Sequence, residues 1–188
     1  MEAILVSAGL VALAEIGDKT QLLAIVLAAK YRKPMPILLG ILIATLLNHA
    51  LAATAGVALA KWLAGPTFQT MVGLAFLAMA AWTLVPDKAD ATQAERTARS
   101  VFLTTLVAFF LVEIGDKTQL ATSLLAARFQ AVVTVTIGTT AGMMLANIPA
   151  VLFGGAVTRV VPLGAVRVAA AAVFALLGAA VLVASLSK

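Results

Sequence analysis

The chain has 188 residues, 63% of them hydrophobic and 11% charged, with a mean hydropathy of +1.10. A typical soluble domain has about 25% charged residues, so this composition excludes a soluble protein and indicates an integral membrane protein. With no cysteine and one histidine, the chain has no disulfide or thiolate chemistry, and a multi-histidine zinc site is disfavoured. The net charge of +5 comes from basic residues scattered between apolar runs, which argues against nucleic-acid binding.

Six apolar runs are each long enough to cross a bilayer, which takes about 20 residues in a helix. In chain order they are Ala3 to Ala29, Pro36 to Ala60, Phe68 to Val85, Val101 to Ala127, Ala131 to Val157 and Val168 to Leu186. The first run has no positive segment before it, so we expect a retained span and not a cleaved signal peptide. The predicted fold class is an all-α membrane protein with six transmembrane helices.

The first and fourth runs contain the same heptapeptide, Glu-Ile-Gly-Asp-Lys-Thr-Gln, at residues 15–21 and again at 113–119, 98 positions later. Four of the eight acidic residues of the chain lie in these two copies. A carboxylate inside an apolar run is costly in a membrane, so its presence indicates a functional site. The first run is long enough to be tilted or to be broken at the motif.

The repeat extends beyond the motif at the same offset. The matching pairs include Gly40 and Gly138, Gly56 and Gly154, Lys61 and Arg159, and Phe76 and Phe174. The sequence thus predicts a three-helix repeat at 1–86, a polar cytoplasmic loop at 87–99 and a second three-helix repeat at 100–188. Because three is odd, the second repeat must be inverted, an architecture that places the functional site near the middle of the membrane.

The distribution of basic residues predicts the orientation. With the N-terminus outside, the inner loops contain Lys30, Arg32, Lys33, Lys88, Arg96, Arg99, Arg159 and Arg167. The outer side then has only Lys61, Arg128 and Lys188. We therefore expect both termini outside, in the inner (plasma) membrane of a bacterial cell. The sequence leaves open whether the unit is a monomer or a homodimer.

Both copies of the motif offer oxygen ligands, which suit magnesium, calcium or manganese. On a continuous helix the acidic and amide positions would be spaced three apart and would share one stripe. These positions are Glu15, Asp18 and Gln21 in the first copy and Glu113, Asp116 and Gln119 in the second. Facing stripes would supply six side chains to one divalent cation.

Six further motif residues are expected to support the site: Gly17, Lys19, Thr20, Gly115, Lys117 and Thr118. The glycines allow close backbone approach or an opening of the helix. Each lysine follows its glutamate by one turn and could pair with it in the empty state, or could be a snorkelling structural residue.

The second run of each half adds weaker candidates. Asn48 and Asn147 are equivalent if one inserted residue is allowed, and each could provide a carbonyl ligand or an interhelical hydrogen bond. In the repeat alignment, the counterpart of His49 is Ile148. A lone histidine is more often a packed or hydrogen-bonded residue than a ligand, so we expect His49 to have a packing role. Met143 and Met144 also favour packing.

The E-x-G-D-K/R-T motif in each half resembles the family of cation transporters that includes MneA-type bacterial manganese exporters and Golgi and chloroplast manganese and calcium/proton transporters. The resemblance covers essentially the whole chain. It implies two inverted halves, a site formed by both motifs with Glu15, Asp18, Glu113 and Asp116 essential, and export of Mn2+ from the cytoplasm. It leaves a Ca2+/H+ antiporter open as the alternative.

No nucleotide-binding loop and no prosthetic group are expected, so a counter-ion must drive export. A carboxylate cluster at low dielectric can exchange protons for metal, which favours H+ over Na+ as the counter-ion. A uniport channel, a structural Glu–Lys lock and an intramembrane aspartyl protease using Asp18 and Asp116 are the competing hypotheses. The protease hypothesis gives the glutamates and lysines no function.

Overall fold

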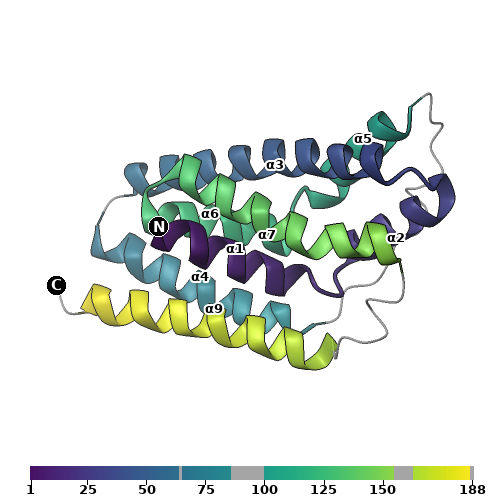
Figure 1. The fold of residues 1–188 in the computed structure, drawn as a ribbon. Helices are drawn as coiled ribbons and strands as arrows, with labels where there is room; N and C mark the ends of the chain where they lie inside the picture. The colour runs from purple at the N-terminus through teal and green to yellow at the C-terminus, as the bar shows by residue number, and fades with distance from the viewer. Residues whose placement is uncertain (64, 86–99, 155–162, 187–188) are drawn as a thin grey trace.

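The computed structural model describes residues 1–63, 65–85, 100–154 and 163–186, and these ranges are helical apart from short connections. The first half contains α1 (Glu2–Glu15), α2 (Lys19–Tyr31), α3 (Pro34–Trp62) and α4 (Pro66–Thr83). The second contains α5 (Val101–Glu113), α6 (Lys117–Phe129), α7 (Val132–Phe153) and α9 (Leu163–Leu186), as Figure 1 shows. The predicted loop at 87–99 lies outside the described residues.

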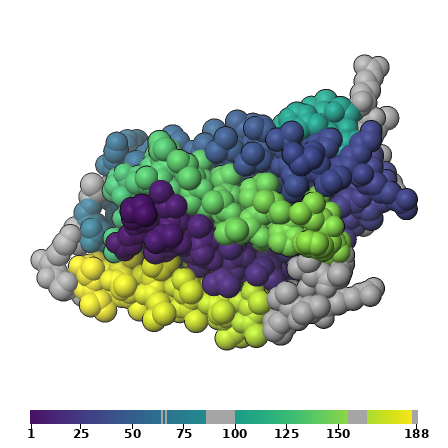
Figure 2. All heavy atoms as spheres, in the orientation of Figure 1, coloured from purple at the N-terminus to yellow at the C-terminus, as the bar shows by residue number. Residues whose placement is uncertain are grey.

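Three of the described helices are long and apolar enough to cross a membrane unbroken, namely α3, α7 and α9. Large apolar side chains point outward, including Leu51 on α3 and Leu176 and Val183 on α9, which are 62%, 70% and 68% exposed. Figure 2 shows α3, α7, α1 and α9 side by side on the face turned to the viewer. Apolar residues outside and carboxylates inside are the arrangement expected when lipid is the solvent. The prediction of an all-helical fold is confirmed for the described residues, and their apolar exterior is consistent with a membrane protein.

The first and fourth apolar runs are each divided into two helices at the motif. α1 ends at Glu15 and α2 begins at Lys19, while α5 ends at Glu113 and α6 begins at Lys117. The break that the sequence allowed in the first run is therefore present, and the fourth run has the same break.

Equivalent helices of the two halves pack in equivalent ways. α1 packs along α7, α5 packs along α3, and α4 packs against its own counterpart α9. In Figure 1 the members of each equivalent pair run in opposite directions, most plainly α4 and α9. The equivalent residues Phe76 and Phe174 are buried and contact each other, with ring centroids 6.3 Å apart.

Two equivalent glycines bring the halves into close contact. A Cβ on Gly40 of α3 would lie 2.7 Å from the Cβ of Thr105 on α5. A Cβ on Gly138 of α7 would lie 2.7 Å from the carbonyl oxygen of Ile4 and 2.9 Å from the Cβ of Ser7, both on α1. Thr105 and Ser7 are themselves 98 positions apart, so both α1 and α5 are held by the same small-residue contact.

Candidate cation site

The first copy of the motif encodes the break between α1 and α2. Ile16 is extended, and Gly17 has a φ of +81°, a conformation that favours glycine because it has no Cβ. Asp18 then caps α2 by accepting the backbone N–H of Thr20 at 3.4 Å. The Gln21 Oε1 accepts the Gly17 N–H at 2.8 Å, which closes the turn.

The second copy makes the same turn. Gly115 has a φ of +75°, Asp116 accepts the N–H of Thr118 at 3.4 Å, and the Gln119 Oε1 accepts the Gly115 N–H at 2.7 Å. The prediction of one continuous helical stripe per copy was therefore wrong. The glycine ends one helix and the aspartate and glutamine start the next, so the acidic residue before the glycine and the one after it lie on different helices.

Acidic residues from both copies meet at the centre of the bundle. Carboxylate oxygens of Glu15, Glu113 and Asp116 all lie within 4.8 Å of one another, and these side chains are at most 2% exposed. Metal–oxygen bonds of roughly 2.0–2.6 Å allow two ligands of one ion to be at most about 4–5 Å apart. The three carboxylates can therefore share one cation. Asp18, also buried, is outside this group.

The motif lysines have partners that the sequence did not predict. The Lys19 Nζ lies 2.8 Å from the Asp116 Oδ1, so this ion pair joins the two halves and is not made with Glu15. The Lys117 Nζ donates to the carbonyl oxygen of Val85 at 3.0 Å, beyond the end of α4. Pairing of Lys19 with its own glutamate, one of the two possibilities that the sequence left open, is not found in this structure, because α1 ends at Glu15 and Lys19 begins a separate helix.

The charge of the cluster fits a divalent cation. Three carboxylates and the Lys19 ammonium, if all are ionised, sum to −2. Hydroxyls orient the glutamates, since Thr20 donates to the Glu15 Oε2 and Thr118 donates to the Glu113 Oε2 at 3.4 Å. The Oε1 atom of each glutamate is buried and accepts no hydrogen bond from the described residues. These two oxygens are therefore available as ligands.

The two asparagines have different surroundings. The Asn48 Nδ2 donates to the Phe110 carbonyl at 3.0 Å, and its Oδ1 faces the Gln119 Nε2 at 3.5 Å. The Asn147 Nδ2 donates to the Met143 carbonyl at 3.0 Å, while its Oδ1 is buried without a hydrogen bond from the described residues. The structure thus leaves the oxygen of Asn147 available and engages that of Asn48.

Both glutamines are engaged in the turns through their oxygens. The Gln21 Nε2 also donates to the Ala146 carbonyl at 3.0 Å, which joins the first motif to α7 beside Asn147. Gln21 and Gln119 therefore hold the broken segments in place in this conformation.

A packing role was expected for His49 from the sequence, and the structure places it beside the acidic cluster. Its Nε2 lies 3.7 Å from the Glu113 Oε2, and the side chain is fully buried on α3. Its position next to Asn48, itself a candidate ligand, was the signal that could have identified it.

A buried acidic cluster between broken helices, in a bundle with an apolar exterior, is the kind of site found in membrane cation transporters. The sequence model of the family described as "Divalent cation/proton antiporter GDT1" matches residues 3–91 and 101–188, which correspond to the two halves. The chain belongs to this family.

A protein of Vibrio cholerae serotype O1 (strain ATCC 39541 / Classical Ogawa 395 / O395), named "Putative manganese exporter", is 48% identical over 181 residues. The match covers 96% of this chain and 90% of the relative. No solved structure matches the chain.

The family match and the Vibrio relative show that the chain is an integral membrane cation transporter and not an enzyme. This result removes the protease hypothesis.

Proposed function

We propose that the protein exports Mn2+ from the cytoplasm in exchange for H+, through a site built by both copies of the motif. The observation that carries this proposal is the buried cluster of Glu15, Glu113 and Asp116, which draws carboxylates from both halves and, when these and Lys19 are ionised, has a net charge of −2. The family description supports a divalent cation and a proton, and the name of the Vibrio relative supports manganese.

The ligand set begins with the three clustered carboxylates and the Asn147 oxygen. Asp18, Gln21, Asn48 and Gln119 are the further ligands or positioning groups of the two motifs. Mn2+ accepts such oxygen donors readily. The positive φ of Gly17 and Gly115 follows the ends of α1 and α5, whose C-terminal carbonyl groups carry the negative end of the helix dipole and would favour a cation.

The ion reaches each side of the membrane by movement of one half against the other. Six spans in two inverted repeats follow if α1 with α2, and α5 with α6, each form one broken span. The opposite directions of equivalent helices and the contact between Phe76 and Phe174 support this arrangement. Rocking of inverted repeats about a central site gives alternating access.

Proton exchange follows from the charge of the empty site. When the cation leaves, three buried carboxylates close together repel one another, and Lys19 neutralises only one of them. Buried carboxylates neutralise by taking up protons. Protons that bind from outside would return the empty site to the cytoplasmic side, so the proton gradient drives export.

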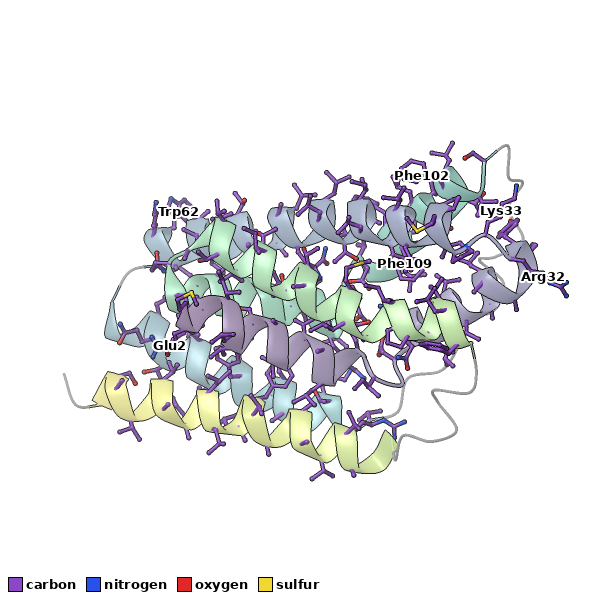
Figure 3. The ribbon with its side chains drawn as sticks, in the orientation of Figure 1. Glu2, Arg32, Lys33, Trp62, Phe102 and Phe109 are labelled. Atoms are coloured by element: carbon purple, nitrogen blue, oxygen red, sulfur yellow. The ribbon has the colours of Figure 1, made fainter. Side chains whose placement is uncertain are left out.

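We propose that the protein lies in the inner membrane of a bacterial cell. Its orientation there is inferred from the charges at the two ends of the helix bundle. Figure 3 shows Arg32 and Lys33 at the end opposite Trp62 and Glu2. The basic residues at the first end support a cytoplasmic location of that end, with the N-terminus outside. The thiol introduced by Thr92→Cys should not react with an impermeant thiol reagent added to intact cells. Ready labelling would show that the orientation is the reverse of the one proposed.

Flux measurements in proteoliposomes test the proposal directly. We expect Mn2+ uptake to follow an imposed pH gradient and to be lost in Asp116→Asn, because this change removes one clustered carboxylate. Ca2+ and Mg2+ are measured in parallel, and a Na+ gradient replaces the pH gradient in a third series. Preference for Ca2+ would identify the alternative Ca2+/H+ antiporter, and no flux of any divalent cation would contradict the proposal.

A further inference from the structure

We propose that His49 is the nitrogen ligand of the cation site and that it selects a transition-metal ion over Ca2+ and Mg2+. The inference rests on the cation site proposed above and adds the group that determines its specificity. The inference starts from the two ring nitrogens of His49, which are buried without a hydrogen-bond partner among the described residues.

His49 is a buried polar group without a hydrogen bond. The residue is 0% exposed, and neither Nδ1 nor Nε2 has a hydrogen-bond partner in the described part of the chain. Buried polar groups in proteins are nearly always hydrogen-bonded, because an unpaired one loses its hydration without compensation. A bound ion at this position would supply the missing partner of one nitrogen.

The position of the imidazole fits a shared ion better than a hydrogen bond. The Nε2 lies 3.7 Å from the Glu113 Oε2, which is too long for an N–H to carboxylate bond. Two ligands of one ion can be up to about 4–5 Å apart. The same glutamate belongs to the cluster with Glu15 and Asp116, so the imidazole stands at the edge of that cluster.

A nitrogen donor changes which ions the site prefers. Ca2+ and Mg2+ bind oxygen ligands almost exclusively. A transition-metal ion also accepts a neutral imidazole, the commonest metal ligand among side chains. One imidazole among carboxylate and amide oxygens therefore favours Mn2+ over Ca2+ and Mg2+. The remaining oxygen ligands still suit Mn2+.

The repeat shows that this group is separate from the duplicated motif. The carboxylates are present in both halves, whereas the equivalent of His49 is Ile148, which is 37% exposed on α7. The duplicated motif supplies the same oxygen donors from both halves, whereas the imidazole comes from the first half alone.

Pulsed EPR of bound Mn2+ tests the assignment, since the chain has one histidine and any imidazole coupling must come from His49. The full chain is purified without a histidine tag and with 15N-labelled histidine, then titrated with Mn2+ alone. We expect the hyperfine coupling of a directly bound nitrogen in the natural sequence and its loss in His49→Gln, which keeps a polar side chain of similar length.

Thr45→Val is the matched control. Thr45 lies one turn earlier on α3, is also 0% exposed, and its hydroxyl oxygen also has no hydrogen-bond partner among the described residues. The variant should therefore keep the nitrogen coupling. A coupling that survives in His49→Gln, or Mn2+ bound without any nitrogen coupling, would overturn the role of His49 and leave the carboxylate site standing. Failure to bind Mn2+ at all would overturn both proposals.

Transport selectivity gives a second readout. In proteoliposomes, His49→Gln should lower the ratio of Mn2+ to Ca2+ flux by roughly tenfold, the lower end of the effect of changes around metal sites. Thr45→Val should keep the ratio of the natural sequence. An unchanged ratio in a correctly folded His49→Gln protein would contradict the inference.

Discussion

Residues 15–21 and 113–119 have the same sequence and nearly the same backbone, with glycine φ angles of +81° and +75° and the same aspartate cap on the following helix. Their side chains nevertheless meet different partners. Lys19 pairs with Asp116 across the interface, whereas Lys117 donates to Val85. Asp116 belongs to the acidic cluster and Asp18 lies outside it.

The comparison separates local from tertiary effects. A heptapeptide sets its own turn, because its glycine, aspartate and glutamine make hydrogen bonds within it. The contacts of its lysine and acidic side chains depend on which helix of the other half lies opposite. We interpret the asymmetry as one conformation of a transporter with two similar halves, in which equivalent residues have unequal roles at any moment.

The largest effect is expected for the glutamates, because both copies of the motif contribute this residue to the acidic cluster. Glu15→Gln and Glu113→Gln should each reduce Mn2+ flux by more than the 10–100-fold typical of changes next to a metal site, because each removes a clustered carboxylate. Glu2→Gln, at the exposed start of α1, is the control and should retain flux. Substantial flux in either motif variant would show that the cluster is not one site.

The aspartates should differ. Asp116→Asn removes a member of the cluster and should weaken Mn2+ binding by roughly 10–100-fold, while Asp18→Asn should weaken it by less. Equilibrium Mn2+ binding to detergent-solubilised protein measures both. Equal losses would mean that the two copies contribute equally to the binding conformation.

A smaller and opposite effect is expected for the lysines. Lys19→Met removes a positive charge 2.8 Å from Asp116, so Mn2+ should bind several-fold more tightly and leave more slowly, since like charges repel. Lys117→Met should change the affinity little. The same binding titration, with release rates, distinguishes them. Weaker binding in Lys19→Met would show that the lysine positions Asp116 for the ion.

The smallest difference should be found between the glycines. Gly17→Ala and Gly115→Ala each place a Cβ at positive φ and should lower the stability by about 1–2 kcal/mol, to the same extent in both copies. Gly9→Ala is the control, because Gly9 lies within α1 with open space around it and should tolerate alanine. Thermal unfolding in detergent provides the comparison, and unequal shifts would contradict the equivalence of the two turns.

Much of the fold could be predicted from the sequence for clear reasons. The length of the apolar runs identified the helices that form α3, α4, α7 and α9, although α9 begins at Leu163, five residues before the predicted start. Glycine in the motif indicated that the first run could break. The continuous stripe was wrong because helical spacing was applied across Gly17, where the chain leaves the helix.

The sequence by itself determined the membrane class, the two-fold repeat and the turn within each motif. Composition, identity at an offset of 98 and local capping need no information about the rest of the chain. Only the tertiary structure decided that Lys19 faces Asp116 and that His49 lies beside Glu113. These contacts join helices distant in sequence, and the packing of α1, α3, α5 and α7 determines which of two identical motifs supplies each group to the site.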